Sequence, residues 1–204
     1  MSRAAPPPLL LTSRSRARRH LLQAAGLHFD ALDSGLDEAR MKRALQAEQP
    51  TPGDMARALA EMKAVKVSKE RPEALVVGAD QVLACDAVLY DKPTDLEQAE
   101  VQLKALRGRD HVLVSAVAVA TNGTAIWHHV DQATLRMRRF SDEALAEYLA
   151  AEGRAVLESV GAYRLEGLGA QLFERVDGDY FTVLGLPLLA LLAFLRGHGH
   201  GLVG

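Results

Sequence analysis

Short apolar runs divided by turn residues predict β-strands in the first two thirds of the chain. Residues 9–12 and 75–78 are strand candidates, and residues 112–120 and 124–135 are two longer ones. Asn122-Gly123, a dipeptide that favours a two-residue hairpin turn, lies between the longer pair. The pattern therefore predicts two separate strands followed by a long antiparallel hairpin.

Signals that begin and end helices accompany several of the other segments. Gly26 stops the first candidate helix, and Thr94 with Glu97 fits a capping box at the start of another. Asp142 and Glu143 place negative charge at the positive end of a later helix dipole. The predicted helices cover residues 15–25, 54–67, 94–106, 141–151 and 186–196.

The order of these elements indicates the fold class. Strands and helices alternate early and the hairpin follows, so we expect an α/β protein with a mixed sheet flanked by helices. A chain of 204 residues can bury one sizeable core, with room for two lobes around a cleft. Because no linker-like segment divides the chain, residues 1–204 are predicted to form a single domain.

The sequence carries little sign of export or membrane insertion. The longest apolar run, residues 184–195, is too short to span a bilayer and contains Pro187, so we expect a buried helix there. The arginines and serines near the N-terminus are similar in composition to an organelle transit peptide, but the strand predicted at residues 9–12 argues against one. The single cysteine, Cys85, excludes an internal disulfide and suits a reducing compartment. We expect a cytoplasmic protein without a membrane partner.

Basic residues are concentrated between the first strand and the first helix. Residues 9–22 read LLLTSRSRARRHLL, and no acidic residue precedes Asp30. A general nucleic-acid-binding domain is usually basic throughout, whereas this chain has a formal net charge of -2. We therefore expect no stable nucleic-acid partner and seek a local role for the cluster.

The same junction has the composition of a phosphate-binding site. Backbone N–H groups at a helix N-terminus and the positive end of its dipole suit a phosphate. Ser13 and Ser15 can add hydroxyl donors, and Arg14 and Arg18 are spaced by one helical turn. The alternative is that one serine only caps the helix and that the arginines are solvated.

Three other positions are candidates for the same site. Asp80 ends the apolar run that begins at Val76, and ligands of α/β sheets bind beyond the carboxyl ends of strands. Lys92 precedes a proline that keeps the backbone extended, and Lys63 lies among apolar helical neighbours. A turn aspartate and surface lysines would look the same. No P-loop, dinucleotide fingerprint, HExxH motif or GxSxG elbow occurs in the sequence.

Taken in order, these residues resemble the Maf family of nucleotide pyrophosphatases over nearly the whole chain, from Leu9 to about Arg196. The matching segments are Ser13 to Arg18, Asp37-Glu38, Lys63-Ala64, Gly78-Ala79-Asp80, Lys92-Pro93, Leu106 to His111, Gly161-Ala162-Tyr163, Glu166-Gly167 and Val183 to Leu188. The resemblance implies an elongated mixed sheet with a deep cleft, as in the inosine-triphosphate pyrophosphatases. It also implies hydrolysis of a nucleoside triphosphate to the monophosphate and pyrophosphate with a divalent cation, Mg²⁺ or Mn²⁺, and it suggests a homodimer.

The resemblance also assigns roles to individual residues. Those assigned to catalysis are Asp80 (the proton acceptor), Lys63 and Lys92; those assigned to the metal are Glu38 and Asp80; those assigned to the substrate are Ser13, Ser15, Arg18, Ala17, Gln81 and Glu166. These roles agree with the chemistry, because water attack on an anionic triphosphate needs its charge neutralised and the water oriented. The catalysis is mostly positioning and electrostatics.

Departures from the main branch of the family concern base recognition. Arg16 and Ala17 replace the proline and the first arginine of the first motif, and Ser159-Val160 replaces a Lys-Ala pair. Gln81 and Glu166 stand where the branch that cleaves 7-methyl-GTP has the same residues, although that branch usually has a large aromatic residue in place of Ala17.

If Glu166 contacts the base of the substrate, its carboxylate favours a guanine-type base. A carboxylate only accepts hydrogen bonds, and guanine presents two donors, N1–H and an exocyclic amine, whereas uracil and thymine suit an amide. A methylated guanine is also cationic, which adds attraction. One alternative is a dTTP- or UTP-preferring pyrophosphatase. Another is a non-catalytic nucleic-acid-binding or regulatory module, which would bind in a salt-sensitive manner without metal-dependent turnover.

Overall fold

The computed structural model describes residues 5–86 and 88–202 of the chain. Its strands are β1 (Leu9–Thr12), β2 (Asp30–Leu32), β3 (Leu75–Cys85), β4 (Val88–Tyr90), β5 (Asp110–Thr121), β6 (Thr124–Met137) and β7 (Phe173–Asp177). The α-helices are α1 (Arg16–Ala24), α2 (Glu38–Gln46), α3 (Pro52–Glu70), α4 (Leu96–Leu106), α5 (Asp142–Glu152), α6 (Tyr180–Val183) and α7 (Leu188–Arg196). Short 3₁₀ helices η1 (Gly153–Glu158), η2 (Val160–Ala162) and η3 (Leu168–Leu172) follow α5.

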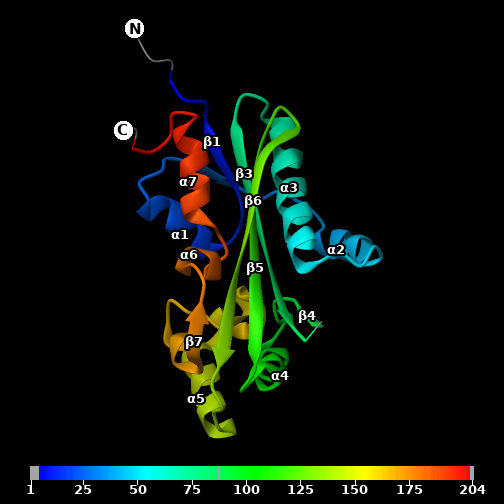
Figure 1. Cartoon of the computed structure of the whole chain (residues 1–204), viewed down its shortest axis with the longest axis vertical. Helices are drawn as coiled ribbons and strands as arrows, with labels where there is room; N and C mark the ends of the chain where they lie inside the picture. Colours follow the sequence, from blue (N-terminus) through cyan, green and yellow to red (C-terminus); the bar gives the residue numbers. More distant parts are fainter. Residues whose placement is uncertain (1–4, 87, 203–204) are drawn as a thin grey trace.

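The strands form one mixed sheet within the described residues. Its order is β2-β1-β3-β5-β6-β7, with β4 added to the free side of β3. β1 is parallel to β2 and β3, and all other pairs are antiparallel. Helices pack on this sheet (Figure 1), so the predicted α/β fold with an elongated mixed sheet is confirmed.

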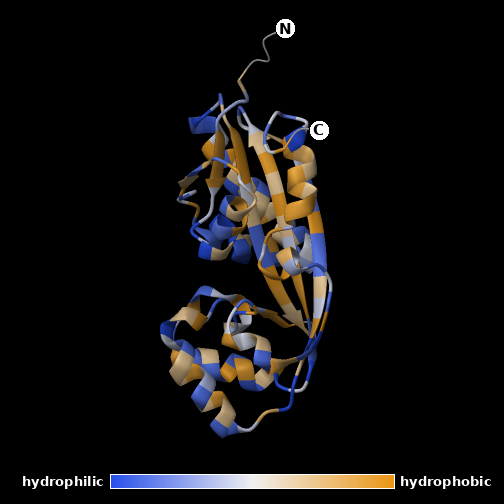
Figure 2. Ribbon diagram, turned by 90° about the vertical axis from the view of Figure 1, so that its left-hand side faces the viewer, coloured by the Kyte–Doolittle hydropathy of each residue, from blue (hydrophilic) through white to orange (hydrophobic). Residues whose placement is uncertain are grey.

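The hairpin of β5 and β6 runs along the length of the molecule (Figure 1). Asn122 and Gly123 form its turn with φ of 46° and 74°, the left-handed backbone that a two-residue turn of this kind requires. This confirms the prediction made from the dipeptide. The helices gather in two groups at the two ends of the long strands (Figure 2).

One face of β3 carries two separate apolar clusters. Ala79 belongs to a cluster that includes Leu22 of α1 and Leu191 of α7, whereas Leu83 belongs to another that includes Leu103 of α4. Gln81 lies between these two residues on the same face, because side chains alternate along a strand. The boundary between the clusters therefore falls on a polar side chain.

The other face of the sheet packs against α3. Ala60 and Ala64 of the helix lie against Gly78, where an added β-carbon would sit 2.2 Å from the carbonyl oxygen of Ala60. A glycine at this position lets the helix approach the strand more closely than any other residue would. Side chains that follow Gly78 on the same face of β3 therefore meet α3 directly.

Several boundaries differ from the prediction. β3 continues to Cys85, so Asp80 lies within its own strand, although it lies beyond the carboxyl end of the neighbouring β1. The N-cap of α4 is Asp95, whose carboxylate accepts the N–H of Gln98, so the capping interaction lies one residue later than Thr94 and Glu97. α7 begins at Leu188, after Pro187.

None of the helices in the described part of the chain is long and apolar enough to cross a membrane.

Candidate functional site

A gap in the pairing of β3 opens the site. On one side β3 pairs with β5 from Val76 to Ala84. On its other side β1 pairs only as far as Gly78 and β4 begins only at Leu83, so residues 79–82 present a free backbone edge. No strand of the described residues pairs with this side of the stretch, although the side chains of Ala79, Asp80 and Val82 are themselves buried.

A cleft with a volume of about 1450 Å³ lies at this edge. It is bordered by the β1–α1 junction, the N-terminus of α2, the loop after β4 and the segment between η1 and η3. All predicted site residues line it, namely Ser13, Ser15, Ala17, Arg18, Glu38, Lys63, Asp80, Gln81, Lys92 and Glu166. The cleft thus brings together residues that are up to about 150 positions apart in the sequence.

Lys63 joins two carboxylates at the cleft wall. Lys63 is carried by α3, which approaches β3 closely at Gly78. Its Nζ lies 2.7 Å from Oδ1 of Asp80 and 3.0 Å from Oε2 of Glu38. The side chains of Lys63 and Asp80 are each only 7% exposed, whereas Glu38 is 40% exposed. The ammonium of Lys63 thus bridges a buried carboxylate on β3 and a half-exposed one at the start of α2.

The second oxygen of Asp80, Oδ2, is buried and has no hydrogen-bond partner among the described residues. Buried polar atoms in proteins nearly always have a hydrogen-bond partner, and one that has none is often reserved for a ligand or for catalysis. Because Asp80 lines the cleft, this oxygen is suited to accept a proton or to bind a cation there.

The N-terminus of α1 is capped as the sequence suggested. Ser15 is the N-cap, and its hydroxyl oxygen accepts the N–H of Arg18 at 3.4 Å. Ser13 accepts the N–H of Ser15 at 3.2 Å, so both hydroxyls face the turn that opens on the cleft. Arg14 precedes the helix and pairs with Asp33 on the surface, so it does not share a helical face with Arg18.

Arg18 reaches from α1 to the free edge of β3. Its Nη1 donates to the carbonyl oxygen of Ala79 at 2.9 Å and its Nε donates to that of Gly185 at 2.7 Å. Burial lowers the pKa of Arg18, an effect opposed by the negative charges of Asp80 and Glu38. The guanidinium therefore stays a fixed positive charge at the cleft wall, held by two backbone carbonyls.

Lys92 lines the cleft from the loop after β4. Partial desolvation and the positive charge of Arg18 lower its pKa, and Glu38 acts against them. The preceding residue, Asp91, fixes the loop through two contacts. Its carboxylate pairs with Lys42, and its carbonyl oxygen accepts a hydrogen bond from Gln102 at 2.9 Å. Lys92 is thereby presented to the cleft without an ion-pair partner in the described part of the chain.

Gln81 has an amide of fixed orientation. Its Nε2 donates toward Ser115 Oγ at 3.0 Å, the carbonyl oxygen of Thr182 at 3.1 Å and that of Val183 at 3.0 Å. Ser115 is fully buried and itself donates to Thr182 at 2.8 Å. A flipped amide would set its oxygen against two carbonyl oxygens, so the remaining group of Gln81 is Oε1, an acceptor.

Glu166 lies at the far wall of the cleft and is paired. Its Oε1 is 3.3 Å from Nε of Arg164, whose Nη1 is 3.3 Å from Oε2 of Glu152. Ala17 is half-buried on the opposite wall, in the first turn of α1. Arg16, next to it, pairs with Glu158 of η1 at 3.8 Å, and this pair is exposed at both ends.

The sequence reasoning missed the groups that hold these side chains. Ser115 stands alone in an apolar strand, which was a usable sign of a buried polar contact. The carbonyl oxygens of Ala79, Thr182 and Gly185 carry no signal in the sequence, because every residue has one.

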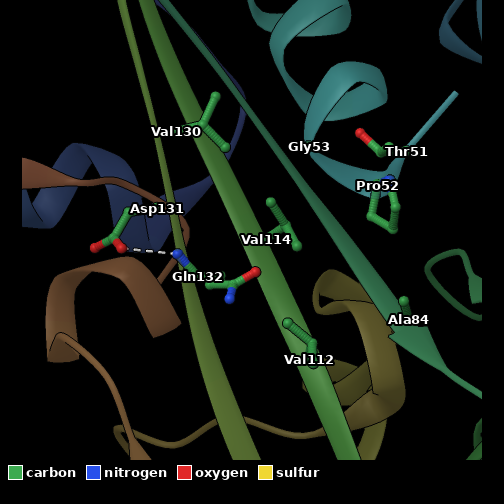
Figure 3. A pocket seen from close by; sticks show the side chains of 9 residues that line it. All are labelled: Thr51, Pro52, Gly53, Ala84, Val112, Val114, Val130, Asp131 and Gln132. Atoms are coloured by element: carbon green, nitrogen blue, oxygen red, sulfur yellow. Dashed lines mark hydrogen bonds between the residues drawn. The ribbon is translucent and has the colours of Figure 1, made fainter.

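A smaller cavity of about 450 Å³ lies beside the N-terminus of α3, over β5 and β6 (Figure 3). Val112, Val114 and Val130 point into it, while the Asp131 carboxylate turns back toward the N–H of Gln132 (Figure 3). The described residues that line it include no lysine, arginine or histidine, so this cavity is unsuited to a phosphate.

Comparisons with known proteins agree with the geometry of the larger cleft. The sequence model of the family described as Maf-like protein matches residues 8–198. A protein of Caulobacter vibrioides named nucleoside triphosphate pyrophosphatase is 52% identical over 192 residues, which cover 94% of this chain and 96% of the relative. One of the same name from Granulibacter bethesdensis is 48% identical over 190 residues, 93% of this chain and 96% of the relative. A 7-methyl-GTP pyrophosphatase of Rhizobium meliloti is 46% identical over 193 residues, 95% of this chain and 97% of the relative.

Proposed function

The chain belongs to the Maf family, and on that premise we propose that it hydrolyses a nucleoside triphosphate with a guanine-type base to the monophosphate and pyrophosphate. The observation that carries the proposal is the buried Asp80, held through one oxygen by Lys63 while the other oxygen has no partner at the cleft. Such an oxygen is what a general base for water needs.

The cations of the cleft suit a triphosphate. Arg18 and Lys92 both line the cleft, and the capped N-terminus of α1 adds backbone N–H groups and a positive dipole end. Neutralising the negative oxygens lowers the electrostatic barrier to attack by water and stabilises the charge that develops on the leaving group.

The proposed reaction replaces one P–O bond with another and transfers one proton. Oδ2 of Asp80 accepts a proton from a water, whose oxygen bonds to the α-phosphorus of the nucleotide. The bond from the α-phosphorus to the bridging oxygen breaks, and pyrophosphate leaves with the electron pair. Arg18 and Lys92 hold the phosphates through these changes, and Lys63 holds the Asp80 carboxylate in place through Oδ1.

A divalent cation fits the carboxylates that are present. The described residues contain no group of three or more metal-ligating side chains, but Mg²⁺ commonly uses one or two carboxylates together with water and substrate phosphates. Asp80 and the half-exposed Glu38 would hold it. When bound, such an ion supplies positive charge to the phosphates and makes water more acidic.

The polarity of Gln81 and Glu166, the residues assigned to base recognition, supports a guanine-type base. Gln81 offers Oε1 because its amide nitrogen is engaged by three acceptors, and Glu166 offers a carboxylate. Both groups accept hydrogen bonds, and guanine presents adjacent N1–H and amine donors. Uracil and thymine present a single N3–H donor between two carbonyl oxygens, so they could satisfy only one of these two acceptor groups.

The test is turnover of a panel of nucleotides, GTP, 7-methyl-GTP, ATP, CTP, UTP and dTTP, with Mg²⁺ or Mn²⁺ and pyrophosphate as the measured product. In water labelled with ¹⁸O, the label should enter the monophosphate and not pyrophosphate, because attack occurs at the α-phosphorus. Asp80→Asn should remove turnover, whereas Asp177→Asn, on the exposed strand β7, should not.

Two results would contradict the proposal at different levels. Label found in pyrophosphate, or full activity of Asp80→Asn, would remove the assigned mechanism. Much faster cleavage of dTTP and UTP than of either guanine nucleotide would leave the mechanism intact and overturn the base preference.

A further inference from the structure

The segment that carries Glu166 is a closely packed loop. The N–H of Gly167 donates to the carbonyl oxygen of Arg164 at 3.2 Å, and an added β-carbon on Gly169 would sit 2.5 Å from that same oxygen. Glu152, at the end of α5, accepts the N–H of Leu168 at 3.2 Å. Glu166 is therefore presented to the cleft from a defined turn.

Arg164 is the cation of this loop. Its guanidinium lies between Glu152 and Glu166, 3.3 Å from each, and all three side chains are at least partly screened from solvent, with Glu152 only 10% exposed. Burial lowers the pKa of Arg164 and the two carboxylates raise it by more, so the group stays positively charged. Arg164 and Glu166 both line the cleft.

We propose that Arg164 is a positioning residue that sets the charge Glu166 presents to the base. By pairing with Glu166, the guanidinium weakens the attraction of that carboxylate for a cationic base such as 7-methylguanine. A neutral guanine, which binds through its donors and carries no net charge, is affected far less. The inference rests on the proposed function, since it concerns the same cleft and the same carboxylate.

The variant that tests this is Arg164→Gln, which keeps a polar side chain and removes one positive charge. The measured quantity is the ratio of kcat/KM for 7-methyl-GTP to kcat/KM for GTP, at a mildly acidic pH that keeps N1 of the methylated base protonated. We expect the ratio to rise about three- to tenfold, because one charge at contact distance in a partly solvated site has an interaction of that order. Added salt should shrink the rise.

Matched variants separate charge from structure. Arg164→Lys keeps the charge and should restore the wild-type ratio. Arg138 donates a hydrogen bond to the carbonyl oxygen of Gln171 and does not line the cleft. The control variant Arg138→Gln also removes one positive charge, and it should leave the ratio unchanged. In a Glu166→Gln background, Arg164→Gln should no longer raise the ratio, because the carboxylate whose charge Arg164 offsets is absent.

The outcomes are distinct. An equal fall of kcat/KM for both nucleotides, with the ratio unchanged, would mean that Arg164 only supports the loop and would overturn the proposal. So would a ratio that falls. If the wild type hydrolyses neither nucleotide, the proposed function fails, and the ratio of Kd values for 7-methyl-GTP and GTP, measured by calorimetry in the same variants, still decides the role of Arg164.

Discussion

Gly78 of β3 and Ala60 of α3 are in such close contact that a β-carbon added to the glycine would lie 2.2 Å from the carbonyl oxygen of the alanine. This contact sets the distance between the helix that carries Lys63 and the strand that carries Asp80. The pairing of the two charges therefore depends on a residue that has no side chain.

Gly78→Ala should force α3 away from the sheet. We expect a loss of about 3 kcal/mol in the free energy of unfolding, since the clash is with backbone atoms that cannot rotate aside. Turnover should fall as well, because Lys63 moves with the helix. Gly53→Ala, in the first turn of the same helix, meets its nearest atom at 3.7 Å and should change stability by less than about 1 kcal/mol. Equal effects in urea unfolding of the two variants would contradict this account.

Lys63 and Asp80 should contribute unequally to stability. Lys63→Met leaves Asp80 buried without its partner, which typically costs about 3 kcal/mol. Asp80→Asn should cost about 1 kcal/mol, because Lys63 keeps Glu38 as a partner and an amide can still contact it. Urea unfolding of both single variants and the double variant measures the coupling. A Lys63→Met protein as stable as the wild type would show that the pair is not a stabilising contact.

Arg18→Lys should separate geometry from charge at the cleft wall. Lysine keeps the positive charge but lacks the planar guanidinium, whose separate Nε and Nη1 donate to the carbonyl oxygens of Gly185 and Ala79. We expect kcat/KM for the preferred triphosphate to fall about 10- to 100-fold, the effect of losing one charged hydrogen bond. Arg43→Lys, on the exposed side of α2, is the control. Unchanged kcat/KM in Arg18→Lys would mean that charge alone is needed.

The parts of the fold that were predicted from sequence are those defined by local signals. β1 and α1 were found because an apolar run meets a capping serine, Ser15, and the long hairpin because Asn122 and Gly123 favour its turn. β2 and α2 were missed, since β2 has three residues and α2 buries none of its side chains completely. Their stability comes from contacts with the rest of the protein, which a periodic pattern does not report.

The candidate site divides in the same way. Ionisable residues such as Asp80 and Lys63 could be named from their type and order along the chain. The contacts that hold Arg18 could not be predicted from the sequence, because its hydrogen-bond acceptors are backbone carbonyls 61 and 167 positions away. The orientation of Gln81 likewise depends on Thr182 and Val183, which reach it only through the tertiary fold.

His111 is a buried histidine outside the cleft. Its Nε2 lies 2.8 Å from the hydroxyl of Tyr163, and its Nδ1 has no partner among the described residues. Burial lowers its pKa from 6.5 to about 4, and the charge of Asp110 opposes this only weakly. The folded protein thus favours the neutral ring.

Stability should therefore decrease as the pH falls from about 6.5 to about 4. In this window the unfolded chain, with an ordinary histidine pKa, binds more protons than the folded protein, whereas above it both states are neutral at this residue. The full effect is about 3 kcal/mol, since one pKa unit corresponds to about 1.4 kcal/mol. His111→Gln keeps a partner for Tyr163 and should flatten this part of the pH profile, measured as the free energy of unfolding in urea. His20→Gln, on the exposed side of α1, should leave the profile unchanged. If wild type and His111→Gln differ by a constant amount between these two pH values, His111 does not titrate there and its burial has no effect on acid stability.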